Sequence, residues 1–404
     1  MQRLFFIGAG FTKALANGPL ANGFIKAIYQ KVQIEDNKYR YSGDWERDRD
    51  CFEKLLVYFY KSILLEAKKS NPNFEEFLDS LNLEFVCSFL DLHINHYYKK
   101  LTKHDKTLIY KTPVPYLKGF TIYELKSALR FIVHHVLDLL LEENLKPNKK
   151  AINKMSTFFK ENDIIISFNY DLLVENMLWE QKLWNPFDGY GIPFKKVANK
   201  YSTKSKIQLL KIHGSINWRS QNELFNPDLE LITEHPFMDK SLFEGMKISK
   251  SKYDKEKYPL YPLNPRVILP TFVKTPQYDW EMKLIKNARD ACREAEEVYI
   301  LGYSVPVADY ITNLLFMDMN KNVEIFIILW DNNNAALRLR SNIASKYELK
   351  EKRIIAEDSP IEKWIENDFK YKAWEKYKTG KKEDEIIRQN LIAAATRLKQ
   401  KNHI

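Results

Sequence analysis

The residues with the clearest chemical potential stand where apolar runs end. His213, with Gly214 behind it, follows the run IQLLKI (207–212). A neutral imidazole can take up a proton near pH 7, which suits general-base chemistry. A lone histidine at a strand end can also be a structural residue satisfied by hydrogen bonds. Its position favours chemistry here, because two further motifs end apolar runs in the same way.

The first of these motifs, Gly8-Ala9-Gly10-Phe11-Thr12, follows the run RLFFI. Two glycines let the backbone approach a pyrophosphate, and the N–H groups that follow can bind it. The third glycine of a dinucleotide-binding GxGxxG pattern is absent, because Lys13 occupies its position. Since any strand–helix turn can use GxG, this turn alone is only weak support for a nucleotide site.

The second motif, Asn169-Tyr170-Asp171, ends the run DIIISF (163–168) and opens a helical pattern. Asn169 and Asp171 would reach the ligand side of a sheet, although either residue alone is better explained as a helix N-cap. Two later strand ends add Gly302 with Ser304, and Asn332. Because carboxyl ends of parallel strands meet at one edge, we expect all these loops to line one crevice.

Alternating strand-like and helical runs predict the α/β class, with a doubly wound, Rossmann-like parallel sheet. Residues 35–160 carry long helical patterns instead and form a large helical insertion. We therefore divide the chain into a Rossmann core (1–34 and 161–357), the insertion (35–160) and a helical C-terminal extension (358–404). The expected strands are RLFFI (3–7), DIIISF (163–168), IQLLKI (207–212), RVILP (266–270), EEVYILGY (296–303) and VEIFIILW (323–330).

Composition excludes several classes of protein. No apolar run reaches the roughly 18 residues of a membrane span, so we expect no membrane association. Three scattered cysteines, Cys51, Cys87 and Cys292, form neither a disulfide framework nor a CxxC zinc site, which indicates a cytoplasmic protein. The net charge of +10 favours phosphate-bearing partners. It leaves direct nucleic-acid binding open, since most charge runs are solvated faces.

Two histidine pairs could suggest a metal site, and we expect neither to form one. His93 and His96 share a helix face with Asp91 nearby, but no fourth ligand is evident. His134 and His135 are neighbours on a helix and point about 100° apart, so they cannot chelate one ion. The sequence therefore predicts no metal.

The motifs GAGFT, FNYD, KIHGSINW and LGYSVP, in this order, resemble those of the sirtuin-like family of NAD-consuming enzymes. More narrowly, they resemble its prokaryotic defence-associated branch. The resemblance covers residues 1–34 and about 161–332. Residues 219–265 contain no cysteine, whereas protein-deacylating sirtuins carry a four-cysteine zinc ribbon there. The glutamine of their Gln-Asn-Ile-Asp motif is replaced by Phe168, which argues against binding of an acyl-lysine peptide.

The resemblance implies an NAD hydrolase that cleaves the nicotinamide–ribose bond without a metal. His213 would be the general base toward a ribose hydroxyl or the attacking water, Asn169 would orient ribose and water, and Asp171 would contact the carboxamide. The implied NAD-binding residues are Gly8, Ala9, Gly10, Phe11, Thr12, Gly302, Ser304 and Asn332. Two alternatives remain open: an NAD-dependent protein deacylase, and a non-catalytic nucleotide-sensing module of a defence complex.

The resemblance also implies a cellular role and partners. The chain would be an antiphage, abortive-infection effector that depletes NAD and is restrained by a regulatory protein, such as a HerA-like ring ATPase or another defence component. We expect a homo-oligomer, because aromatic residues recur outside the predicted sheet and the stretch EIIRQNLIAAATRLKQK carries an apolar stripe that could instead fold back on its own core. These aromatic residues are Tyr58, Phe59, Tyr60, Tyr97, Tyr98, Trp364, Trp374 and Tyr377.

Overall fold

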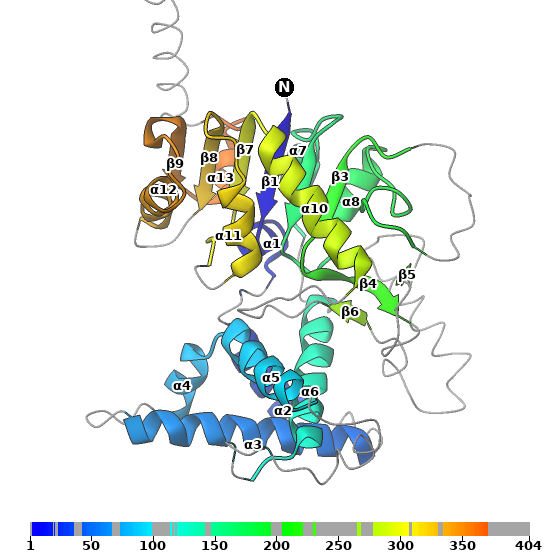
Figure 1. Cartoon of the computed structure of the whole chain (residues 1–404), viewed down its shortest axis with the longest axis vertical. Helices are drawn as coiled ribbons and strands as arrows, with labels where there is room; N and C mark the ends of the chain where they lie inside the picture. The colour runs from blue at the N-terminus through cyan, green and yellow to red at the C-terminus, as the bar shows by residue number, and fades with distance from the viewer. Residues whose placement is uncertain are drawn as a thin grey trace, which may run out of the picture.

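The fold is that of a computed structural model, and its described part is built around one parallel sheet (Figure 1). Six strands of that part lie in the order β3-β2-β1-β7-β8-β9, with every neighbouring pair parallel. The residues described are 2–18, 20, 23–35, 43–66, 73–98, 114, 117, 119–141, 147–194, 204–220, 229–231, 265–267, 278–306, 309–329 and 334–370.

The strand order is that of a doubly wound, Rossmann-like sheet, which confirms the predicted fold class. The chain starts at the central strand, builds one half outward to β3, and returns to β7 to build the other half. Ligands of such sheets bind where the strand order reverses, here between β1 and β7. The strands are β1 (Arg3–Ile7), β2 (Ile164–Ser167), β3 (Gln208–Lys211), β7 (Glu297–Leu301), β8 (Glu324–Leu329) and β9 (Ile354–Asp358).

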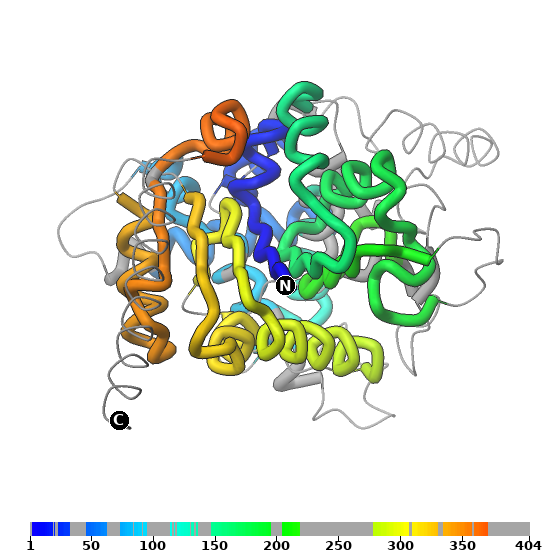
Figure 2. The backbone as a smooth tube through the Cα atoms, turned by 90° about the horizontal axis from the view of Figure 1, so that it is seen from above, coloured from blue at the N-terminus to red at the C-terminus, as the bar shows by residue number. Residues whose placement is uncertain are grey.

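Apolar side chains on both faces of the central strands explain why helices cover both sides. In β1 the residues from Leu4 to Ile7 are fully buried. Figure 2 shows α10 and α11 along one side of the sheet, and α1, α7 and α13 along the other. These helices, with α8 beside α7 and α12 against the outer strands, span Ala9–Ala16 (α1), Lys149–Ser156 (α7), Leu173–Glu180 (α8), Asp279–Glu294 (α10), Tyr310–Met317 (α11), Ala335–Lys346 (α12) and Ile361–Glu366 (α13).

A second, antiparallel sheet contains the strands β4 (Gly214–Ser220), β5 (Leu229–Leu231) and β6 (Pro265–Val267), in the order β5-β4-β6. The run RVILP was expected to belong to the main parallel sheet, and this prediction is wrong. Its described residues pair with β4 instead, because β4 directly follows His213 and turns away from the main sheet. The final strand of the main sheet, β9, was not expected.

The helices α2 to α6 form a separate layer with its own hydrophobic cluster. Figure 1 shows this layer on the side of the sheet where β1 ends. Its cluster includes the apolar residues of α2, whereas the apolar residues of α7 pack with the sheet. The boundaries between the two hydrophobic clusters therefore differ from the limits 35 and 160 that were expected for the insertion. The helices are α2 (Phe24–Glu35), α3 (Gly43–Glu66), α4 (Phe74–Ser80), α5 (Leu83–Tyr98) and α6 (Ile122–Leu141). Over the residues described, no helix is long and apolar enough to cross a bilayer.

Four of the eight aromatic residues that suggested an oligomer interface are accounted for by packing within the chain. Phe59 is buried in the helical cluster, and Tyr58 and Tyr60 pack against it. Trp364 is fully buried in the main core, so it cannot contribute to an interface as the sequence had suggested. Tyr97 and Tyr98 end α5, and nothing is described of their side chains. Trp374, Tyr377 and the C-terminal apolar stripe lie outside the described residues.

The helical layer also contacts the loops at the end of the sheet. Tyr170 and Leu172 come from the segment after β2, and Ile216 comes from β4, yet all three belong to the helical cluster. The backbone N–H of Ile216 donates to the Tyr170 carbonyl over 3.1 Å. The helical layer is therefore packed directly on the two segments that carry Asn169 and His213.

Candidate active site

Close approach of two turns explains the glycines at the centre of the sheet. The turn after β1 meets the turn after β7, and the Gly10 N–H donates to the Gly302 carbonyl over 2.9 Å. A Cβ atom on Gly8 would lie 2.7 Å from that carbonyl oxygen, and one on Gly302 would lie 2.2 Å from the Phe11 nitrogen. Gly302 also has a φ of +59°. The glycine pattern is therefore required by packing between the two halves of the sheet.

The backbone amides of this turn are largely engaged within the protein. The Gly8 N–H donates to the Leu301 carbonyl and the Phe11 N–H donates to the Gly8 carbonyl. The Phe11 side chain is fully buried in the core, whereas Ala9 is half-buried. Ser304 is exposed at the end of β7, and Asn332 lies outside the described residues. Binding of a pyrophosphate or adenosine by these residues stays a prediction.

Asn169 and Asp171 are joined to the first turn through Thr12. Asn169 Nδ2 donates to the Gly8 carbonyl (2.9 Å) and to Thr12 Oγ1 (3.0 Å). Thr12 Oγ1 in turn donates to Asp171 Oδ2 over 2.7 Å. Asp171 Oδ1 accepts the N–H of Leu173, the first residue of α8, but the N-cap of that helix is Leu172, so neither Asn169 nor Asp171 is the N-cap. The structure thus brings together two motifs that the sequence places far apart.

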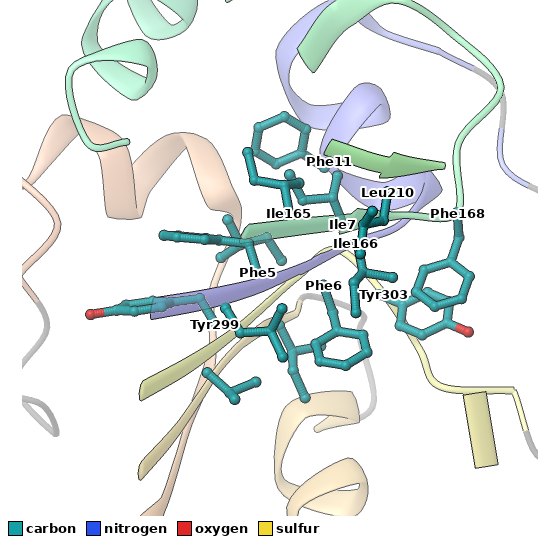
Figure 3. Close-up of a cluster of buried hydrophobic side chains, with 14 of the residues drawn as sticks. Phe5, Phe6, Ile7, Phe11, Ile165, Ile166, Phe168, Leu210, Tyr299 and Tyr303 are labelled. Carbon is teal, nitrogen blue, oxygen red and sulfur yellow. The ribbon is translucent and has the colours of Figure 1, made fainter. Parts of the chain in front are cut away.

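His213 lies at the same edge, held among aromatic rings and one carboxylate. Its Nε2 atom is 3.4 Å from Asp309 Oδ2. The Phe168 ring meets the imidazole edge-on at 5.3 Å, and Tyr303 stacks on Phe168 with centroids 4.0 Å apart. Figure 3 shows the Phe168 and Tyr303 rings lying face to face beyond the end of β1. The motif at Asn169, the motif at His213 and the loop after β7 therefore converge at one edge of the sheet, as the strand pattern predicts.

These side chains are enclosed in this conformation. His213 is 4% exposed and Asn169 is 7% exposed. The sequence predicted that these loops would line one crevice, and the structure shows both side chains covered instead of open to solvent. The rings of Phe168 and Tyr170 lie beside the imidazole, with Tyr303 stacked on Phe168, and they account for part of the enclosure.

A second cluster of polar side chains lies next to these residues, at the end of β3. Lys211 Nζ pairs with Glu175 Oε1 over 2.8 Å, and it also donates to the Asp171 carbonyl. The Tyr190 hydroxyl donates to the same Glu175 oxygen, and Asn217 Nδ2 donates to that hydroxyl. Burial raises the pKa of the Glu175 carboxyl, although Lys211 opposes that shift. The cluster also holds the Tyr190 phenol neutral, because burial and then Glu175 raise the pKa of that hydroxyl.

The two histidine pairs dismissed as metal sites lie in the helical layer. His93 Nδ1 contacts the Phe89 carbonyl one turn earlier, and His135 Nδ1 contacts the Phe131 carbonyl in the same way. The side chains of Asp91, His96 and His134 lie outside what the structure describes. Within the described residues, no group of three or more His, Cys, Asp or Glu side chains could hold a metal ion.

Asp309 and Lys211 were both missed by reasoning from the sequence. Asp309 follows the motif LGYSVP by three residues and precedes a helix, so it looks like an ordinary N-cap. Lys211 interrupts the apolar run IQLLKI, and a charge inside a buried strand signals a buried partner. That signal was present in the sequence, whereas the pairing of Asp309 with His213 depends on the fold.

Comparison with known proteins gives a distant structural likeness. No protein-family model and no curated protein matches the sequence. Among solved structures, one described as the structural basis for the mechanism and regulation of Sir2 enzymes is 12% identical, with a TM-score of 0.38, over 94% of this chain and 93% of that chain.

Two further matches are also Sir2 structures. A complex of Sir2 with the inhibitor EX-527, 2'-O-acetyl-ADP-ribose and a deacetylated p53 peptide is 10% identical, with a TM-score of 0.30, over 85% of this chain and 93% of that chain. A complex of Sir2 with a p53 peptide and NAD+ is 12% identical, with a TM-score of 0.25, over 85% and 92%. At these values, no residue role is transferred to this chain.

Proposed function

We propose that this protein hydrolyses NAD at the nicotinamide–ribose bond, giving nicotinamide and ADP-ribose. The observation that carries the proposal is the hydrogen-bonded chain from Asn169 through Thr12 to Asp171, with His213 on the adjacent strand end. These hydrogen bonds join the ends of β1 and β2, next to the reversal in strand order between β1 and β7 where doubly wound sheets bind nucleotides. The order of the four sequence motifs adds the resemblance to sirtuin-like enzymes.

The chemistry needs little acid catalysis and one base. Nicotinamide leaves as a neutral molecule from a cationic glycosidic bond, so its departure requires no proton. The ribose that remains carries positive charge and is attacked by water. His213 accepts a proton from that water or from a ribose hydroxyl, and one proton is released overall. Asn169 orients the ribose and the water through its amide, whose rotation is fixed by the Gly8 carbonyl and Thr12.

Substrate binding requires the enclosed site to open. A dinucleotide cannot contact Asn169 and His213 while both are less than 10% exposed. The segments that cover them carry Tyr170 and Ile216, which pack into the helical layer. The helical layer is therefore the part of the molecule whose position would govern access of NAD to the base.

The direct test is release of nicotinamide from NAD by the purified protein, followed by chromatography. We expect His213→Ala and Asn169→Ala each to lower the rate by about 10²- to 10⁴-fold, the contribution typical of general-base and orienting groups. His93→Ala is a matched control, because it removes a histidine ring of the helical layer and should leave the rate unchanged. Normal turnover in His213→Ala, with the fold intact by circular dichroism, contradicts the assigned base.

The same assay separates hydrolysis from deacylation. We expect nicotinamide release without any peptide, and no stimulation by an acetyl-lysine peptide. Release that depends on such a peptide would support the protein deacylase instead. Binding of NAD without turnover would support a nucleotide-sensing module. Chelation of metal ions should leave both activity and thermal unfolding unchanged, as the sequence predicts for a metal-free site.

A role as an antiphage effector, with NAD depletion as the means of abortive infection, follows from the narrower resemblance. A protein that destroys NAD must be restrained, and we propose a homo-oligomer held in check by a regulatory partner such as a HerA-like ring ATPase. Light scattering tests the oligomer. Measurement of cellular NAD after phage infection, in cells carrying either the natural protein or His213→Ala, tests the role.

A further inference from the structure

Asp309 has more contacts than helix capping needs. It is the N-cap of α11, and its Oδ1 atom accepts the Thr312 N–H over 3.4 Å. That contact uses one carboxylate oxygen. The other oxygen, Oδ2, lies 3.4 Å from His213 Nε2 and accepts the Tyr303 hydroxyl over 3.3 Å. Capping alone would be satisfied by Ser, Thr or Asn and does not explain why the second oxygen faces the imidazole.

We infer that Asp309 is a positioning residue that fixes the tautomer of His213. A carboxylate can only accept hydrogen bonds, so the Nε2 atom that faces it carries the proton. A neutral imidazole has one N–H, so the lone pair resides on Nδ1, which becomes the basic nitrogen. The inference deepens the proposed NAD hydrolysis, because it names which nitrogen of the base acts.

The surroundings of the imidazole restrict its rotation. Phe168 packs edge-on against the ring, and Tyr303 stacks on Phe168. Tyr303 is itself anchored, since its hydroxyl lies 2.6 Å from Thr312 Oγ1. The loop after β7 therefore supplies both the Asp309 carboxylate and Tyr303, which supports the Phe168 ring. Asp309, Phe168 and Tyr170 are among the groups that face the imidazole.

The same contact matters most once the base has taken up a proton. The imidazolium then stands beside a carboxylate in a place where each side chain is 5% exposed. Poor solvation strengthens the attraction between the two charges, as in other histidine–aspartate pairs of hydrolytic enzymes. The separation of 3.4 Å is long for a hydrogen bond, and such contacts commonly shorten when substrate binds.

The test uses Asp309→Asn in the full chain. Asparagine keeps the shape and the capping ability, but its amide N–H₂ can donate to Nε2 and so favours the opposite tautomer. We expect turnover of NAD to fall by about 10²-fold or more, with an unchanged thermal unfolding midpoint. Asp163→Asn is the matched control, because Asp163 is a buried aspartate at the opposite end of β2 that pairs with Arg3.

A spectroscopic measurement keeps this inference separate from the proposed function. The ¹⁵N chemical shifts of the His213 ring, assigned by their loss in His213→Gln, report the tautomer without any substrate. We expect the Nε2–H form in the natural protein and in Asp163→Asn, and the Nδ1–H form in Asp309→Asn. An Nδ1–H form in the natural protein overturns the inference, and so does an unchanged tautomer in Asp309→Asn. If the natural protein shows the Nε2–H form but does not cleave NAD, only the proposed hydrolysis fails.

Discussion

Lys211 and His213 leave the same strand end two residues apart, yet their surroundings differ in kind. Lys211 pairs with Glu175 in a cluster whose members come from β3, α8, β4 and the turn at Tyr190. All of these come from the part of the chain between β2 and β7. His213 pairs instead with Asp309, which belongs to the half that follows β7. Lys211 is paired within its own part of the chain, whereas the contact of His213 crosses the reversal in strand order.

The difference indicates how one strand end can serve both stability and chemistry. In the Lys211 cluster, Lys211 donates to the Asp171 carbonyl, and the side chains of the cluster are buried away from any ligand. The His213 pair lies beside the chain of Asn169, Thr12 and Asp171 at the ligand edge. We therefore expect changes in the first cluster to alter the free energy of unfolding, and changes in the second to alter turnover.

The largest effect on stability is expected from Lys211→Met. The substitution leaves Glu175 buried without its cation, and breaking a buried pair in this way costs about 3–5 kcal/mol. Unfolding in urea, followed by circular dichroism, measures the loss. The double variant Lys211→Met with Glu175→Leu should recover most of the stability, because replacement of both charges is often neutral. A single variant as stable as the natural protein would show that the comparison is wrong.

A smaller effect is expected where the two halves meet, from Gly302→Ala. We expect the free energy of unfolding to fall by about 2–5 kcal/mol, since the left-handed backbone costs about 1–2 kcal/mol and overpacking adds about 1–3 kcal/mol. Gly119→Ala is the matched control: its φ is +94°, but a Cβ atom there meets nothing within 4 Å. Equal losses in both variants would mean that the contact between the two turns tolerates a methyl group.

The smallest effect on stability is expected at a surface ion pair, which serves as a reference for the larger losses expected at Lys211 and Gly302. The Arg289 guanidinium donates to Asp318 and lowers the pKa of that carboxyl. A lowered pKa stabilises the folded state above the unfolded value of about 3.9, and this stabilisation is lost as the pH falls through the folded value. Asp318→Asn should therefore cost less than about 1 kcal/mol at pH 7 and nothing near pH 2 in urea unfolding. A constant cost at both pH values would contradict the assignment.

Much of the fold could be predicted from the sequence because buried parallel strands are apolar on both faces. The runs that became β1, β2, β3, β7 and β8 were all recognised in this way. The strand β9 was missed, since its sequence IIAED loses its apolar character after three residues. RVILP was placed in the wrong sheet, because periodicity identifies a strand but does not say which strand it pairs with.

The candidate site could be predicted only in its broad position. Strand ends of a parallel sheet share an edge, so the convergence of His213 with Asn169 follows from topology alone. The hydrogen-bond partners of these residues do not follow from topology. Thr12 was expected to face a pyrophosphate, yet it bonds Asn169 and Asp171, and Asp309 reaches His213 from a loop nearly one hundred residues later. Such contacts depend on how the two halves of the sheet are packed together.

The central place of β1 has a consequence for how the chain folds as it is synthesised. Leu4 pairs with Ile164 on one side and with Val298 on the other, so the central strand leaves the ribosome long before either neighbour exists. At about 5–20 residues per second, β1 waits roughly 15–60 s for β7 to be made. During that time its apolar residues are open to misassembly, and pairings of such long range also form slowly. The helices α2 to α6 all precede β2 in the chain, so the helical layer can form before the sheet that carries the site begins to close.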